Sequence, residues 1–285
     1  MKWFLIFLVF LSNPGWALQV ARPDQLRGDI TSALREIENS SWEIRQAGLH
    51  ALMKITAPQH EPVETSKFPS RLHDLFSAAP QDRDQVVTAL IALLSRENAN
   101  AHRGTMSGKQ LGEDYFNFYG DVIASVVALN DRRAIPALLG AIDTGGMVTR
   151  SLASFGDAAL PGILQRVNDQ DTLVRMGAIN TLAEMLGKNP ALFNANPIET
   201  EQVKRALLSA AADNEPGVRM AAVGGLAALK DPSVLSVIQK LAESDPARLP
   251  GQADGGTDLY PVRLAAQRAR VRIGSKQAHD PPRPQ

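Results

Sequence analysis

The chain has 285 residues, of which 44% are hydrophobic and 5% aromatic, and its 30 basic residues balance its 30 acidic ones. This neutral balance excludes proteins that bind nucleic acids or anionic surfaces through a large basic charge. The sequence contains no cysteine, so a disulfide framework and a lipid-bearing cysteine are also excluded. Packing alone must hold the fold, and we expect no nucleic-acid partner.

The first 17 residues are typical of a secretory signal peptide. Lys2 precedes an apolar run from Trp3 to Leu11, which is followed by a Pro-Gly break and by Ala17 at a cleavage position. The run has nine residues, whereas a helix needs about 20 to cross a bilayer, so cleavage is favoured over a retained anchor. We expect cleavage after Ala17, a periplasmic or extracellular mature protein, and no stable membrane span.

Helical periodicity begins in the next segment, which opens the repeat domain expected over residues 18–274. Residues 41–52 contain the pair Ile44-Arg45, and a leucine follows seven positions after the arginine. Residues 56–70 are rich in proline and polar side chains and predict a loop. Helical spacing returns at 82–96, and residues 98–114 are polar and contain glycine, so we expect a flexible insertion there.

The second half of the chain repeats the pattern more regularly. Apolar residues at helical spacing predict helices or helix pairs at residues 115–130, 131–139, 147–167, 169–187 and 199–212. A glycine-rich loop at 248–257 and a truncated last copy from residue 259 follow. The proline-rich tail, 275–285, is expected to be disordered.

Residues 213–245 form the clearest helix pair. Their apolar positions, which predict one buried stripe per helix, are Val218, Ala221, Ala222, Gly225, Leu226 and Leu229, then Val234, Leu235, Ile238, Leu241 and Ala242. Pro216 suits a first helical turn, with Asp213 or Asn214 as the capping residue. Asp231 and Pro232 restart the pattern after a short turn, which predicts antiparallel neighbours.

The spacing of the copies indicates an α-solenoid. Arg175, Arg219 and Arg263 are each 44 residues apart, and every interval contains two predicted helices. A helix of about three turns is not stable alone in water, so such pairs must stack on each other. We therefore predict an all-α fold, an α-solenoid of stacked antiparallel helix pairs.

These residues resemble the HEAT-repeat family, particularly the bacterial HEAT-like type with the pattern D-x-x-x-x-V-R-x-x-A-x-x-x-L. In that family the aspartate and the arginine six residues later form a hydrogen-bonded ladder between repeats. The resemblance assigns this structural ladder to Asp169, Arg175, Asp213 and Arg219. The pattern departs elsewhere, because Thr257 stands six residues before Arg263.

Two groups of arginines allow a second reading. The row formed by Arg45, Arg150, Arg175, Arg219 and Arg263 fits an anion-binding surface, although its regular place beside acidic residues favours the internal ladder. The last helix is basic through Arg268, Arg270, Arg272 and Lys276. It would dock an acidic partner or simply cap the array with a solvated face.

Four aromatic residues near the predicted insertion form the sharpest candidate for partner binding. Tyr115, Phe116, Phe118 and Tyr119 fall within five positions, and aromatic residues are enriched at binding hot spots. Phe116, Tyr119 and Ile123 also have helical spacing, which is the ordinary pattern of core residues. Both interpretations remain open at this point.

The sequence contains no pattern that supports catalysis, a cofactor or a metal. The histidines lack metal-ligand spacing, and they are His50, His60, His73, His102 and His279. A glycine-containing stretch at 104–109 has the wrong spacing for a phosphate loop, and no nucleophile elbow occurs. We therefore predict no catalytic, cofactor-binding or metal-binding residues.

Together these features predict a secreted, non-catalytic repeat scaffold that binds another protein through the surface of its second helices. The alternative is a small-molecule-binding or lyase-like protein resembling the bilin lyases, which also use HEAT-like repeats. Such a protein needs a pocket at a repeat junction, and the aromatic group with Glu113 and Asp114 is the local hint of one.

Overall fold

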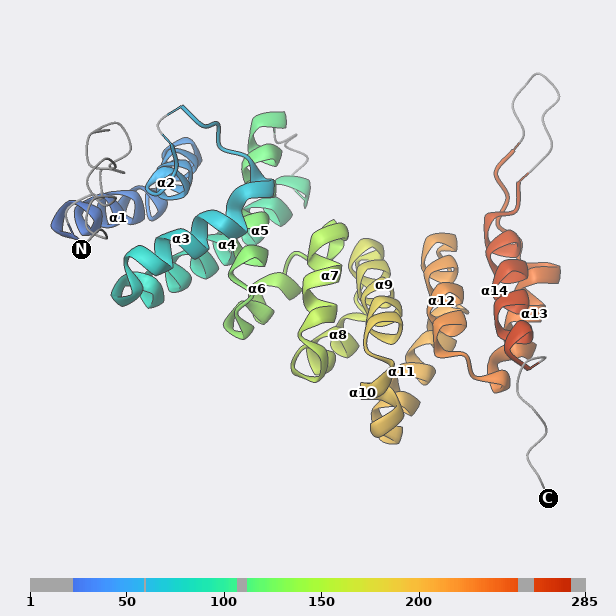
Figure 1. Cartoon of the computed structure of the whole chain (residues 1–285). Helices are drawn as coiled ribbons and strands as arrows, with labels where there is room; N and C mark the ends of the chain where they lie inside the picture. The colour runs from blue at the N-terminus through green and yellow to red at the C-terminus, as the bar shows by residue number, and fades with distance from the viewer. Residues whose placement is uncertain (1–22, 59, 107–111, 251–258, 278–285) are drawn as a thin grey trace, which may run out of the picture. The chain divides into compact units, whose positions relative to one another are not determined.

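The computed structural model describes residues 23–58, 60–106, 112–250 and 259–277 (Figure 1). Within these ranges the predicted all-α class is confirmed: there are fourteen α-helices and six short 3-10 helices, and β-structure is limited to one bridge between Leu249 and Leu259. The predicted signal peptide, 1–17, lies outside the described residues. The chain forms two compact units, Met1–Ala89 and Leu90–Gln285, and each is described by itself.

Unit 1 is built on a pair of helices, α1 (Pro23–Ile37) and α2 (Trp42–Lys54), with α3 (Phe68–Ala78) packed against α2. The first two helices approach closely at Gly48, because a Cβ there would lie 2.8 Å from the carbonyl oxygen of Ala33. Arg27 and Asp82 form an ion pair at 3.6 Å. The core side chains include Ile30, Leu34, Leu49, Leu52, Phe68, Leu72 and Leu75.

The prediction of a flexible insertion at 98–114 is wrong for residues 98–106, which are helical. Helix α4 (Arg83–Met106) contains the boundary between the units and continues through residues 98–106, and α5 begins at Glu113. Polar residues suggested a loop, but the amide of Asn98 is buried and donates to the carbonyl oxygen of Ala137 at 2.8 Å. This side chain is therefore satisfied inside the protein. Residues 107–111 lie outside the described ranges.

Over the described residues, unit 2 contains ten further helices. They are α5 (Glu113–Leu129), α6 (Ile135–Leu139), α7 (Gly146–Ser154), α8 (Leu160–Arg166), α9 (Thr172–Lys188), α10 (Pro190–Ala195), α11 (Pro197–Ala210), α12 (Pro216–Leu229), α13 (Leu235–Ser244) and α14 (Pro261–Gln277). The last of these enters the region predicted as a disordered tail. Helix α10 lies between the segments predicted as helices at 169–187 and 199–212.

Helices α7, α9, α12 and α14 pack side by side, as Figure 1 shows. Two glycines let neighbouring elements approach closely. A Cβ at Gly177 of α9 would lie 2.1 Å from the carbonyl oxygen of Ile142, and one at Gly225 of α12 would lie 2.5 Å from the side chain of Leu207 in α11. A larger residue at Gly177 would meet backbone and force the neighbours apart, whereas one at Gly225 would meet the end of the Leu207 side chain, which can move.

The helix pair predicted at 213–245 is present, with one change at its start. Helix α12 begins at Pro216, but its N-cap is Glu215 and not Asp213 or Asn214. The chain turns at Lys230, whose φ of 57° lies in the left-handed region. Asp231 then caps the following 3-10 turn by accepting the backbone N–H of Ser233 at 2.8 Å.

Candidate functional site

Arg219 joins the start of α12 to the end of α13. Its Nε donates to Oδ2 of Asp245 at 2.7 Å, and its Nη2 donates to Oδ1 at 3.0 Å. Its Nη1 donates to the backbone oxygens of Asp213 and Asn214 at 2.8 and 2.9 Å. One guanidinium therefore binds both the entry to its own helix and the carboxylate that follows the next one.

The pair formed by Arg219 and Asp245 is largely shielded from water, since their side chains are 10% and 1% exposed. The hydrogen bond to Asp245 raises the pKa of Arg219 above its ordinary value. Burial by itself would raise the pKa of Asp245. The hydrogen bonds from Arg219 and from the N–H of Ala247, with the charges of Arg219 and Arg263, hold that pKa below its ordinary value. Both groups are therefore ionised at neutral pH.

Arg175 makes the same contacts one step earlier in the chain. Its Nε and Nη2 donate to the carboxylate of Asp213 at 2.8 and 3.1 Å, and its Nη1 donates to the backbone oxygens of Asp169 and Gln170, both at 3.0 Å. These are again the residues six and five positions before the arginine. The predicted ladder residues Arg175, Asp213 and Arg219 thus lie in one continuous chain of hydrogen bonds.

Part of this geometry recurs in unit 1, where Nη1 of Arg45 donates to the backbone oxygens of Asn39 and Ser40 at 3.1 and 2.7 Å. The residue six positions before each arginine also fixes the local turn, because its side-chain oxygen accepts the backbone N–H two residues later. This occurs at Asn39, Asp169 and Asp213, with N to O distances of 2.9, 3.0 and 2.8 Å. The copies are therefore alike in hydrogen bonding as well as in sequence.

Asp245 is the acidic residue that precedes the last helix in the ladder. A fixed spacing of six residues before Arg263 points instead to Thr257. The Nε of Arg263 donates to the backbone oxygen of Asp245 at 2.7 Å across 18 residues, where the earlier copies have a separation of six. The preceding interval is shorter by the same amount, since Arg219 reaches its next acid after 26 residues and Arg175 after 38. The equal 44-residue spacing therefore hides two unequal repeats.

The ladder is interrupted at α7. The carboxylate of Asp169 is paired with Arg166 at 3.2 Å, and Arg150, which we had placed in the arginine row, is exposed. Thr149 is the buried residue at this position, and its hydroxyl has no hydrogen-bond partner among the described residues. A buried threonine therefore stands at the position of the ladder arginine in this copy, and Arg150 lies one residue after it.

The four aromatic residues near the start of α5 do not share one environment. Tyr115, Phe118 and Tyr119 are buried, with 5%, 0% and 7% of their surface exposed, whereas Phe116 is 49% exposed. Three of the four side chains thus belong to the core of unit 2. Phe116 alone of this group presents its ring to solvent.

The two buried tyrosines bind polar side chains of α4. The hydroxyl of Tyr115 donates to Oε2 of Glu97 at 2.8 Å, and that of Tyr119 donates to Oδ1 of Asn98 at 2.7 Å. Burial, together with the nearby carboxylates of Asp143 and Glu97, raises the pKa of Tyr119 above its ordinary value. This tyrosine therefore remains a protonated hydrogen-bond donor, and the cluster ties α4 to α5.

A row of half-exposed apolar side chains lies at the beginnings of α5, α7, α9, α12 and α14. We call it the first-helix face, and its members are Phe116, Met147, Leu173, Met220 and Leu264, which are 40% to 51% exposed. Each lies within the first five residues of its helix. The hydrogen bonds from Arg175 to Asp213 and from Arg263 to Asp245 place the beginnings of α9, α12 and α14 next to one another.

Three side chains of this face, those of Leu173, Met220 and Leu264, lie at equivalent positions on their helices. Leu173 stands two residues before its ladder arginine, and Met220 and Leu264 stand one residue after theirs. Positions three residues apart occupy one side of an α-helix, so the register of the row is regular. Contact between neighbouring helices is also direct here, since the sulfur of Met176 lies 3.3 Å from where a Cβ on Gly217 would stand.

Helix α12 presents no exposed charge on the first-helix face. The only charged side chain of α12 is Arg219, which is 8% exposed and held in the ladder, and the exposed positions of this helix include Met220 and Gly224. By contrast, exposed charges are common on the second helices, with Glu201 and Arg205 on α11 and Lys240 and Glu243 on α13. The cores of protein interfaces are depleted in charge and enriched in methionine and aromatic residues.

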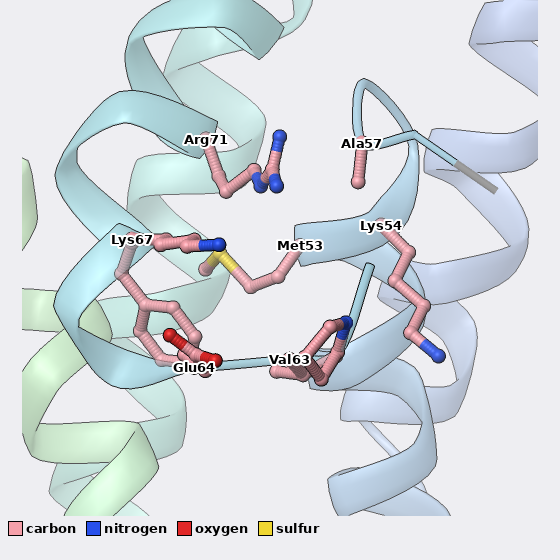
Figure 2. A pocket seen from close by; sticks show the side chains of 9 residues that line it. Met53, Lys54, Ala57, Val63, Glu64, Lys67 and Arg71 are labelled. Carbon is pink, nitrogen blue, oxygen red and sulfur yellow. The ribbon is translucent and has the colours of Figure 1, made fainter. Parts of the chain in front are cut away.

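Unit 1 contains a small pocket between α2 and the beginning of α3, shown in Figure 2. Met53, Lys67 and Arg71 point toward it, and it encloses about 10 Å³, room for about one water molecule. The carboxylate of Glu61 binds both Lys67 and Arg71. The hydrogen bond from Lys67 contributes most to lowering the pKa of Glu61 below its ordinary value, and the hydrogen bond from Arg71 contributes next. These charges are already paired within the protein.

Among the residues that the structure describes, no three His, Asp or Glu side chains gather in a way that would hold a metal ion. None of the helices in the described ranges combines the length and the apolarity that a bilayer crossing requires.

Comparisons with known proteins leave the family unassigned. No family model matches this chain, and no curated protein matches it. A crystal structure of an engineered protein is similar over 87% of this chain and 97% of its own length, with 16% sequence identity and a TM-score of 0.41.

Proposed function

We propose that this protein is a non-catalytic α-solenoid of HEAT-like repeats that binds another protein. The repeated guanidinium contacts at Arg45, Arg175 and Arg219 support the repeat assignment, because each arginine binds the carbonyls five and six residues before it. The side-by-side packing of α7, α9, α12 and α14 is the arrangement that stacked repeats produce.

The observation that carries the binding role is the first-helix face. Half-exposed apolar side chains recur at the same end of successive helices, on a surface where α12 presents no exposed charge. Apolar patches exposed on soluble proteins are typical of interaction sites. The proposed face therefore differs from the second-helix surface that the sequence suggested, because α11 and α13 present charged residues there.

We further propose that the chain is exported through its N-terminal segment, so that the partner is a protein of the periplasm or of the extracellular space. The apolar run that follows Lys2 supports this proposal.

Site-specific photocrosslinking in the producing cell tests the binding role. A photoreactive residue at Met220 should give a discrete crosslinked protein, and the same residue at Gln239, which is exposed on α13, should not. The change Leu173→Glu, on the same face, should remove the crosslink because it places a charge in the interface core. A crosslink that forms equally from both sites, or that survives Leu173→Glu, contradicts the proposal.

A further inference from the structure

Exposed carboxylates accompany the apolar side chains of the first-helix face. Glu113 and Asp114 lie in the same helical turn as Phe116. Asp171 stands two residues before Leu173 and is fixed there, because its carboxylate accepts the backbone N–H of Leu173 at 2.7 Å.

Met220 has the same kind of neighbour. Glu215 is the exposed N-cap residue of α12, and its side chain makes no capping hydrogen bond. The nearby cations are turned inward, since Arg175 and Arg219 are held by the carboxylates of Asp213 and Asp245. The edge of the apolar row along α9 and α12 is therefore acidic.

We propose that the first-helix face binds a protein segment that presents apolar side chains flanked by lysine or arginine. The inference rests on the proposed function and adds the chemistry of the partner. Apolar side chains would pack against Leu173 and Met220, while basic residues would lie near Asp171 and Glu215. Complementary charges at the rim of an interface mainly set specificity and association rate. Anionic lipids and nucleic acids would instead meet repelling carboxylates.

Two synthetic helical peptides test the charge preference. Both carry the same stripe of leucine and methionine, which is flanked by lysine in one peptide and by glutamate in the other. Binding to the full chain, as isolated from the producing cell, is measured by fluorescence anisotropy at low and at high salt. We expect the lysine peptide to bind about tenfold more tightly at low salt, and we expect salt to reduce this difference.

Matched variants locate the effect. The double change Asp171→Asn with Glu215→Gln should remove most of the preference for lysine, and Met220→Ser should weaken both peptides. Glu201→Gln on α11 removes an exposed carboxylate elsewhere and should change neither affinity. Circular dichroism of each variant verifies that the helical content is preserved.

The outcomes separate this inference from the proposed function. Equal binding of the two peptides, with loss of both in Met220→Ser, overturns the basic partner and leaves a protein-binding face. A lysine preference that persists after neutralisation of Asp171 and Glu215 overturns the inference, as does binding of anionic phospholipid vesicles that Met220→Ser abolishes. Failure of both peptides to bind overturns it too, and if the crosslink at Met220 is also absent, the proposed function fails with it.

Discussion

Replacing Arg219 by methionine should destabilise the protein more than removing either of two comparable cations. The substitution keeps most of the apolar stem but removes both hydrogen bonds to Asp245. It also removes the donor that serves two backbone oxygens at the start of α12. The remaining carboxylate is 1% exposed, so water cannot replace the lost partner.

The size of the effect follows from burial. Removing one partner of a buried ion pair costs about 3–5 kcal/mol. Arg175→Met should cost less, about 1.5–3 kcal/mol, because its side chain and that of Asp213 are 16% and 14% exposed. Lys188→Met is the matched control: its pair with Glu184 is 45% and 35% exposed and contributes about 0.5 kcal/mol or less.

Thermal unfolding followed by circular dichroism measures this order. For a chain of this size about 3 kcal/mol lowers Tm by roughly 6–12 °C. The pH dependence gives a second readout. Because the pKa of Asp245 is lowered in the folded state, its stabilisation is present above the ordinary value of 3.8 and is lost as the pH falls through the folded value. The stability difference between the wild type and Asp245→Asn should therefore shrink in acid. A loss for Arg219→Met no larger than that for Lys188→Met refutes the reasoning.

Three further predictions concern packing, the buried tyrosines and export. Gly177→Ala should lower Tm, because the new Cβ would lie 2.1 Å from the carbonyl oxygen of Ile142. The control Gly224→Ala places a Cβ with nothing within 4 Å and should raise stability by about 0.5–1 kcal/mol. The opposite order of Tm values would contradict the packing described for α9. Tyr119→Phe should cost about 1–3 kcal/mol in urea unfolding, since a buried amide oxygen loses its donor, and an unchanged midpoint would show that this bond is unimportant. Mass spectrometry of the exported protein should find an N-terminus directly after Ala17, and an intact Met1 on the exported protein would exclude cleavage.

The helices themselves were largely predictable because apolar periodicity directly reflects burial. The limits of α12 follow from Pro216 at its start and from the restart at Asp231. The continuation of α4 was not predictable in this way, because residues 98–106 are polar and contain no apolar stripe. Asn98 is buried by partners on other helices, and no local pattern reveals such partners.

The ladder could be read from sequence only where its spacing is constant. Asp213 precedes Arg219 by six positions, whereas Asp245 precedes Arg263 by 18, which hides the relation from any fixed template. The first-helix face was missed for another reason. Hydrophobic periodicity does not distinguish an apolar residue in the core from one at its border, so the exposure of Met220 appears only after the helices are packed.

Arg175 and Arg219 each bind a carboxylate that comes later in the chain. During synthesis Arg175 has emerged 38 residues before Asp213, and Arg219 emerges 26 residues before Asp245. Until that aspartate has been synthesised, the guanidinium has no ladder carboxylate to bind. Each of these two Arg–Asp contacts can form only after part of the next copy has been synthesised. Truncation just before Asp213 or Asp245 therefore leaves the preceding copy incomplete.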